Sequence, residues 1–178
     1  LDIGDNGCGM TSRQNNELIL QANANYSTYA QAGVPATRIN LTNSGEFHFL
    51  NAPAGTAIGD TITFIERMRI DSLGNVGIGV VPKTGGPTWQ HVQFGGTGNI
   101  IARQSDTSLG AMFANNYYIN SSNVDSAIQT GEAARVFMSA GDIRFDNAQS
   151  VAANAQVSFD TRMKILSNGN VGIGTTTP

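Results

Sequence analysis

The stretch RMRIDSLGNVGIG, residues 67–79, occurs a second time as RMKILSNGNVGIG at residues 162–174. The wider segments 61–79 and 156–174 align without a gap, and 11 of their 19 positions are identical. Each copy reads as a strand, a tight turn and a shorter returning strand. Repetition at a long period is typical of chains built from similar stacked units. The repeated phrase therefore predicts an all-β fold.

The repetition extends upstream in weaker form. Residues 45–52 (GEFHFLNA) resemble residues 141–148 (GDIRFDNA). We therefore predict one β-rich unit over residues 1–82 and a second over residues 89–178. The intervening residues 83–88 contain two glycines and one proline, which indicate a linker or turn.

Apolar and polar side chains alternate before each turn, as expected of strands. One apolar face is predicted to contain Ile62, Phe64, Met68 and Ile70 in the first copy, and Val157, Phe159, Met163 and Ile165 in the second. In both copies a polar residue interrupts this apolar face at the equivalent position, Glu66 in the first copy and Thr161 in the second. A polar residue there predicts a bulge or a polar contact between chains. Other strands are predicted at residues 17–22, 38–42, 46–50, 99–103, 112–119, 135–139 and 142–146.

The returning strand contains glycines that present no side chain. Gly74 and Gly169 occupy the turn and are expected to have positive φ. Gly77 alternates with apolar neighbours, and glycine inside a strand is best explained by a close approach of other atoms. Three identical strands meeting at a threefold axis would supply that approach; a large aromatic of the same chain, such as Phe64, is the alternative. The predicted axis residues are Val76, Gly77, Ile78, Gly79, Val171, Gly172, Ile173 and Gly174.

The amino-acid composition argues against nucleic acid and membranes as binding partners. Charged residues make up 13 % of the 178 positions, about half the roughly 25 % of an average globular protein. The net charge is −3 and cationic residues do not cluster, whereas binding to nucleic acid requires clustered Lys and Arg. No apolar run approaches the roughly 18 residues of a membrane span. We expect neither nucleic acid nor membrane as a partner, and the single Cys8 excludes an intrachain disulfide.

The segments ERMRIDSLGNVGIGVVP (66–82) and TRMKILSNGNVGIGTTTP (161–178) closely resemble a signature of bacteriophage tail fibres and related viral appendages. In many of those proteins the phrase precedes a self-cleaving chaperone of the endosialidase type. The first copy departs from the pattern at GVVP. The resemblance implies an intertwined homotrimeric fibre segment on a virion, outside the cell. Its implied partners are further copies of itself, other fibre or baseplate segments, and host surface polysaccharide.

The carboxylates give no sign of catalysis. Three pairs lie close in sequence: Asp142 with Asp146, Glu66 with Asp71, and Asp2 with Asp5. A glycosidase needs two carboxyl groups about 5–9 Å apart, whereas Asp142 and Asp146 would lie about 13 Å apart along one strand. His48, His91 and Cys8 lack the spacing of zinc ligands. We therefore predict no enzyme activity, no catalytic residue, no metal site and no cofactor.

Two aromatic groups are candidate sugar contacts. The first consists of Trp89, Gln90 and His91, and the second consists of Asn115, Asn116, Tyr117, Tyr118 and Asn120. Adjacent tyrosines in a strand face opposite ways, so one of the two is expected to be exposed. The alternative for these aromatic residues is a place in the core or in a subunit interface.

Three functions remain open on this evidence. We favour a structural and host-attachment segment of a viral tail fibre that binds surface glycan without catalysis. The first alternative is a tailspike-type enzyme, which would release reducing ends from polysaccharide. The second is a monomeric carbohydrate-binding module, which would lose sugar binding on Trp89→Ala or Tyr117→Ala.

Overall fold

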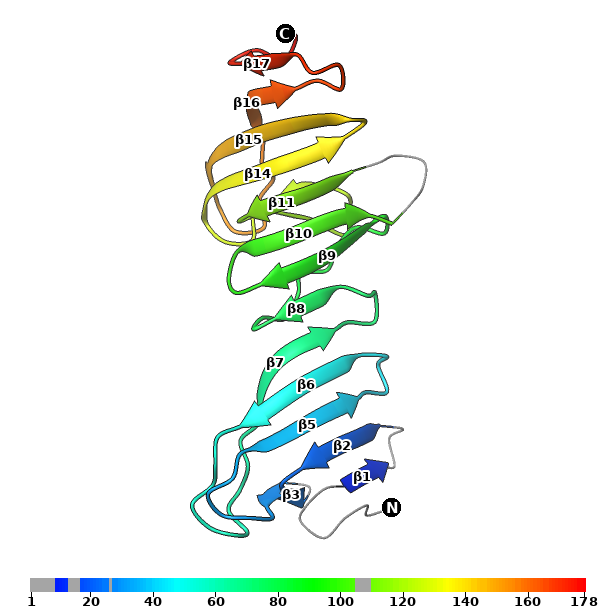
Figure 1. The fold of residues 1–178 in the computed structure, drawn as a ribbon, viewed down its shortest axis with the longest axis vertical. Helices are drawn as coiled ribbons and strands as arrows, with labels where there is room; N and C mark the ends of the chain where they lie inside the picture. Colours follow the sequence, from blue (N-terminus) through cyan, green and yellow to red (C-terminus); the bar gives the residue numbers. More distant parts are fainter. Residues whose placement is uncertain (1–8, 13–16, 26, 105–109) are drawn as a thin grey trace. The chain divides into compact units, whose positions relative to one another are not determined.

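The computed structural model describes residues 9–12, 17–25, 27–104 and 110–178. These residues form strands, turns and irregular segments, with no helix among them (Figure 1), which confirms the predicted all-β class. The chain divides into two compact units, Leu1–Leu73 and Gly74–Pro178. Asp2, Asp5 and Cys8, which the sequence analysis considered, lie outside the described residues.

The first unit is built on an antiparallel sheet with the strand order β1-β2-β5-β6-β7. The strands span Gly9–Ser12, Leu18–Ala22, Ala36–Leu41, Phe47–Ala52 and Ile65–Ile70, respectively. A small pair, β3 (Ala24–Asn25) and β4 (Thr28–Tyr29), lies in the connection from β2 to β5. The strands predicted from the alternating pattern are therefore present in this unit.

The core of the first unit lies where the long connections pack on one another. Tyr29 N donates to the Asp60 carbonyl at 3.0 Å, and Ile62 N donates to the Ser27 carbonyl at 2.7 Å, which joins the β3–β4 pair to the segment before β7. The buried cluster consists of Ala24, Tyr29, Ala36, Ala52 and Ile62, with Phe64 packed against it. Small residues predominate, so the two connections approach closely.

The second unit contains a mixed sheet with the strand order β8-β9-β10-β11-β14-β15-β16-β17. The strands span Val76–Ile78, Trp89–Phe94, Gly98–Arg103, Ala111–Asn115, Gly131–Ser139, Asp142–Val151, Asp160–Ile165 and Val171–Ile173, respectively. The β8–β9 pair is parallel and the other neighbours are antiparallel. A small pair, β12 (Tyr118–Ile119) and β13 (Asp125–Ser126), lies between β11 and β14.

The core of the second unit lies between one face of this sheet and the connections that cross it. Ile101 and Met112 point into the core from β10 and β11, and they are 0 % and 1 % exposed. The other buried members are Tyr117, Ile119, Ala127, Ala133, Ala148 and Val157, with Trp89, Phe137 and Phe159 partly buried against them. The sheet therefore has one covered face, and its other face carries no covering segment of this kind among the described residues.

A bulge interrupts one strand of each unit. In β7, Arg67 is an extra residue, because its neighbours Glu66 and Met68 pair with consecutive residues of β6. In β16, Arg162 is extra in the same way. These register shifts confirm the bulge that the polar residue at Glu66, and at Thr161 in the second copy, predicted.

The two bulges are held by the same side-chain contact. Arg67 Nε donates to Asn51 Oδ1, and Arg162 Nε donates to Asn147 Oδ1, both at 2.7 Å. Each arginine is thereby tied to the neighbouring strand.

The bulge divides the apolar face predicted from simple alternation. The residues before it, Ile62, Phe64, Val157 and Phe159, belong to the two cores. The residues after it, Met68, Ile70, Met163 and Ile165, lie on the opposite, uncovered face of each sheet. The prediction of one shared face was therefore wrong, because an extra residue reverses the side to which the following residues point.

The tight turns follow the sequence prediction. Gly74 has φ +85° and Gly169 has φ +91°, as predicted for the turn position. Between β16 and β17, Leu166 N donates to the Asn170 carbonyl and Gly169 N to the Leu166 carbonyl, each at 2.9 Å. Glycine is needed there because other residues rarely adopt this left-handed conformation.

The predicted linker lies within the second compact unit. Gly85 forms an isolated bridge with Asn120, and Lys83 N donates to Gln93 Oε1 at 2.9 Å. The segment 83–88 therefore packs against the strands that follow it. The boundaries of the repeat units at residues 82 and 89 remain predictions from the sequence repeat. The two compact units of the structure meet between Leu73 and Gly74.

Candidate functional site: an uncovered apolar sheet face

The uncovered face of the second unit carries a row of apolar side chains. Directly paired residues of neighbouring strands lie on the same face of a sheet. The pairing therefore aligns Val76, Val92, Ile100, Phe113, Val136, Phe145, Met163 and Ile173 across the strands β8 to β17. A parallel row on the same face contains Ala102, Ala111, Met138, Ile143, Ile165 and Val171.

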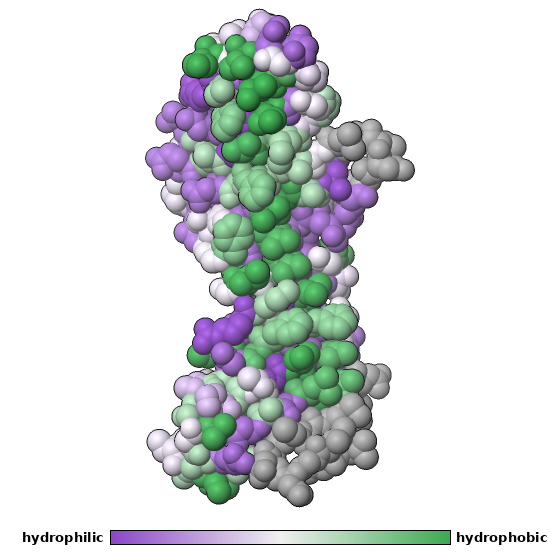
Figure 2. Space-filling model, viewed as in Figure 1, coloured by the Kyte–Doolittle hydropathy of each residue, from purple (hydrophilic) through white to green (hydrophobic). Residues whose placement is uncertain are grey.

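These side chains are half-buried or exposed. Phe113 is 56 % exposed, Phe145 is 40 % exposed and Ile173 is 79 % exposed. Figure 2 shows hydrophobic residues gathered along the strands of the second unit. An antiparallel sheet with one face in water normally alternates apolar inward and polar outward residues. Here the uncovered face is apolar, and large exposed apolar patches mark sites of interaction.

A groove of about 440 Å³ lies on this face. Phe94, Phe113 and Phe145 line it, and Ala134, with its small side chain, lies among them. The three phenylalanine rings surround Ala134, whose small side chain leaves the space between them unfilled. The groove is thus shaped to receive an apolar side chain from another surface.

The first unit has an uncovered apolar face of the same kind. Pairing aligns Leu20, Ile39, Phe49 and Met68 in one row, and Leu18, Leu41, Phe47 and Ile70 in the next. Leu20 is 39 % exposed and Phe47 is 45 % exposed. Each unit, taken by itself, therefore leaves a band of branched and aromatic side chains without a covering layer among the described residues.

The strand glycines are crowded by their own chain. A Cβ on Gly77 would lie 2.1 Å from the Val80 carbonyl oxygen and 2.6 Å from Pro82 Cδ. A Cβ on Gly172 would lie 2.7 Å from the Thr175 carbonyl oxygen. The segment that follows each strand folds back over the glycine. This local fold explains why glycine occupies both positions without the Phe64 ring. The placement of these strands at a threefold axis stays a prediction.

The other predicted axis residues lie around these strands. Ile78 and Val171 are 46 % and 52 % exposed on the uncovered face. Gly79 and Gly174 have φ of +67° and +71°, and a Cβ added to either would meet no described residue within 4 Å beyond its chain neighbours. The positive φ explains these two glycines, while the apolar neighbours are the residues free to meet another surface.

The predicted sugar contacts lie inside the second unit. Tyr117 is 0 % exposed, Tyr118 is 7 % exposed and Asn116 is 4 % exposed. Strand β11 ends at Asn115, and Asn116 turns the chain with φ +55°, so the two tyrosines do not alternate across a strand. The expectation that one ring is exposed was wrong, and these residues offer no aromatic face to a sugar.

Trp89, the remaining predicted sugar contact, is partly buried against the core of the second unit. The Arg103 guanidinium lies 4.8 Å from the centroid of its ring. A cation over the indole face is a favourable pairing, and it occupies a surface that a sugar ring would need.

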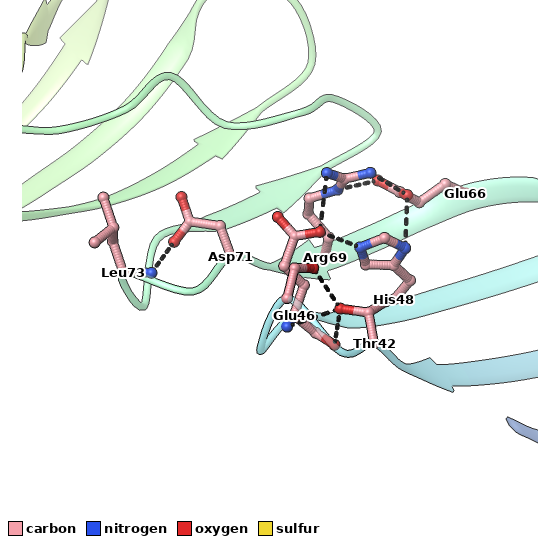
Figure 3. Close-up of polar contacts among 8 residues, drawn as sticks. Thr42, Glu46, His48, Glu66, Arg69, Asp71 and Leu73 are labelled. Atoms are coloured by element: carbon pink, nitrogen blue, oxygen red, sulfur yellow. Dashed lines mark hydrogen bonds and ion pairs between the residues drawn. The ribbon is translucent and has the colours of Figure 1, made fainter. Parts of the chain in front are cut away.

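The first unit contains a charged cluster on the strands β6 and β7 and on Glu46, the residue before β6 (Figure 3). His48 Nε2 lies 3.0 Å from Glu46 Oε2, and His48 Nδ1 lies 3.5 Å from Glu66 Oε2. Arg69 donates through Nε and Nη2 to the two Glu66 oxygens, each at 2.8 Å. These hydrogen bonds hold the pKa of Glu66 below its ordinary value of 4.5, and the Glu66 carboxylate raises the pKa of Arg69. The cluster ties the two strands together.

A second polar cluster lies under the sheet of the second unit. Arg135 Nε donates to Asp146 Oδ2 at 2.9 Å, and its Nη1 donates to Asp125 Oδ2 at 3.2 Å. The guanidinium stacks 4.0 Å from the Phe159 ring centroid. The Tyr117 hydroxyl donates to Asp125 Oδ1, and burial raises the pKa of this hydroxyl. The Asp146 side chain is only 1 % exposed and is paired with Arg135, whereas the Asp125 side chain is 36 % exposed, so the network runs from the interior to the surface of the unit.

The carboxylates considered for catalysis are engaged in structural contacts. Lys164 Nζ lies 2.8 Å from Asp142 Oδ2, and Ser167 N donates to Asp142 Oδ1. Asp71 Oδ1 accepts from Leu73 N in the turn after β7. Within the part of the chain that the structure describes, no group of three or more His, Cys, Asp or Glu residues could hold a metal ion. The described residues include no helix long and apolar enough to cross a membrane.

No protein family, no curated protein and no solved structure matches this chain.

Proposed function

We propose that this chain is a structural and host-attachment segment of a viral tail fibre, built of two repeated units and assembled as a homotrimer. The observation that supports this most directly is the uncovered apolar face of each unit. Full burial of one Val, Ile, Phe or Met side chain contributes about 1.5–3 kcal/mol. A face with many such residues favours association, and the partners nearest at hand are further copies carrying the same face.

The repeated units of this proposal are supported by matched interior contacts. Arg38 lies 4.1 Å from the Phe64 ring centroid, and Arg135 lies 4.0 Å from that of Phe159. Each arginine stands two residues after a buried alanine of its unit, Ala36 or Ala133.

A matched pair of asparagines supports the same point. Asn23 and Asn116 both have positive φ and are buried. The Oδ1 of each accepts from the backbone N–H of a glutamine, Gln31 or Gln129, at 2.7 Å. Their amide nitrogens donate to carbonyl oxygens of the same connection. Two units with the same internal contacts are what stacking of a repeat along a fibre requires.

The number of copies and the setting rest on the resemblance of residues 66–82 and 161–178 to tail-fibre sequences. The apolar face requires only that another apolar surface cover it. Three chains around an axis satisfy this requirement and leave the charged and neutral polar side chains outside. The virion, its other fibre or baseplate segments and a host surface polysaccharide are the corresponding location and partners.

The oligomeric state tests the proposal. Native mass spectrometry and light scattering of the full chain should give three chain masses. Phe113→Asp together with Phe145→Asp places two charges on the face and should give a folded monomer. Ser158→Asp, at an exposed position outside the face, should remain trimeric. A folded wild-type monomer at micromolar concentration would overturn the proposal.

Attachment is tested separately from assembly. The trimer should bind a surface polysaccharide from a panel of bacterial strains, without generating new reducing ends. Release of reducing ends would instead identify an enzyme. Binding that persists in the Phe113→Asp, Phe145→Asp monomer would identify a carbohydrate-binding module that acts as a single chain.

A further inference from the structure

The strands β8 and β17 have the same local structure. Their surroundings read Asn-Val-Gly-Ile-Gly in both cases, at residues 75–79 and 170–174. The final glycines have φ of +67° and +71°. In both strands the central glycine is covered by the residues that follow, so the backbone takes the same course.

Within the second unit, strand β8 has β9 as its neighbour. It pairs in parallel with β9, with Val76 opposite Val92 and Ile78 opposite Phe94. Gly95 N donates to the Ile78 carbonyl at 3.0 Å and extends this pairing by one residue. The segment that covers Gly77 is present at the same time, so the cover and the parallel strand are compatible.

Strand β17 lies at the end of its sheet. It pairs with β16 on one side, and no described residue pairs with its other edge. Ile173 is 79 % exposed, whereas the equivalent Ile78, beside β9, is 46 % exposed. An open edge presents backbone N–H and C=O groups that can pair with another strand.

We propose that the free edge of β17 accepts a parallel β-strand with the pattern of β9. The incoming segment places a branched apolar residue opposite Val171 and an aromatic residue opposite Ile173, as Val92 and Phe94 do beside β8. Backbone hydrogen bonds supply the affinity of such strand addition, and the alternating side chains supply its specificity. The pairing groups are the backbone groups of the sheet edge, and the side chains of the added strand extend the apolar rows that contain Val171 and Ile173.

The test extends the full chain after Pro178 with a copy of residues 83–95. Hydrogen exchange of the amides at Val171–Ile173 should slow by about tenfold or more, and the unfolding temperature should rise. The matched control carries Val92→Asp and Phe94→Asp in the appended copy only. Equal exchange with the two extensions would overturn the proposal. The comparison is made at one oligomeric state, so a monomeric chain would refute the trimer without affecting this result.

Disulfide trapping tests the direction of the added strand. In a Cys8→Ser background, Ile173→Cys is combined with Phe94→Cys in the appended copy, and Val171→Cys is combined with the same change as the control. A parallel strand brings the first pair into register, while the second pair stands roughly 7–8 Å apart, beyond the usual reach of a disulfide. Bond formation in the first pair alone is expected. The reverse preference would show an antiparallel strand and overturn the proposal.

Discussion

Because Gly77 and Gly172 have no side chain, the segment after each strand can pack directly against the strand backbone. The carbonyl oxygen three residues later lies too close for a Cβ, at 2.1 Å for Val80 and 2.7 Å for Thr175. The sequence predicted that other atoms approach these glycines closely, and the structure confirms this close approach. The sequence could not identify the approaching atoms, because they belong to a following loop whose course depends on the tertiary structure.

Gly77→Ala is expected to destabilise the chain by about 1–3 kcal/mol, since the added methyl group must displace backbone and a proline ring. Urea unfolding followed by circular dichroism measures the loss. Gly96→Ala is the matched control: its Cβ would meet only the Gln129 Nε2 atom, the end of a flexible side chain, at 3.0 Å. The loss should not depend on protein concentration, because the contact lies within one chain. Equal stability of the two variants would contradict this account.

Glu66 gives the stability of the first unit a defined pH dependence. Its pKa is lowered in the folded chain, chiefly by the Arg69 hydrogen bonds, so the unfolded state binds the proton more tightly. The contribution is therefore present above about pH 4.5 and is lost as the pH falls through the lower, folded value.

Glu66→Gln should cost about 1 kcal/mol or less at pH 7, because the pair is partly solvated. The difference from wild type should shrink at pH 3, because below about pH 4.5 the unfolded state takes up the proton more readily than the folded carboxylate does. Urea titrations at the two pH values measure it, with the exposed Glu132→Gln as the control. A difference that is the same at both pH values would contradict the assignment.

At the scale of elements, the bulge explains which parts of the sequence prediction succeeded. The strands and the turn glycines were predicted because alternation and Asn-Gly signals are local. The polar slot at Glu66 and Thr161 indicated the bulge itself. The faces were predicted wrongly because an alternating pattern does not show that Arg67 is extra, although that residue decides which side Met68 faces.

The same limit applies to the candidate sugar contacts. Tyr117 and Tyr118 look like neighbours in one strand, but Asn116 ends the strand and turns both rings inward. The uncovered face is also invisible to a sequence pattern, because either face of an apolar strand could be the covered one. Only the pairing of strands far apart in the chain shows where Phe113, Phe145 and Ile173 align.

Two single-residue deletions in β16 test the role of the bulge. Deleting Arg162 should leave Met163 outward and Thr161 inward, and should cost about 1 kcal/mol for the lost hydrogen bond to Asn147. Deleting Thr161 instead places Arg162 beside the buried Asp146, removes the Thr161 hydrogen bond to that carboxylate and should cost more. Chemical denaturation compares the two shortened chains. A larger loss for the Arg162 deletion would show that the bulge residue itself is essential.

At the scale of the whole molecule, paired polar side chains are buried in the interior, whereas apolar side chains are exposed on the surface. Arg135 and Asp146 are paired beneath the sheet, while three phenylalanines border a groove on its open side. In a monomeric protein, the charged residues would be expected on the surface and the large apolar residues in the interior. This uncovered apolar surface is what the proposed association of copies would bury.

The single tryptophan of the chain, Trp89, lies against the core of the second unit, with a guanidinium over its ring. Excitation near 295 nm consequently gives an optical signal from that half of the molecule alone. A shift of the emission maximum to longer wavelength, compared with the loss of the far-ultraviolet β signal, then reveals whether the two halves melt together or one after the other.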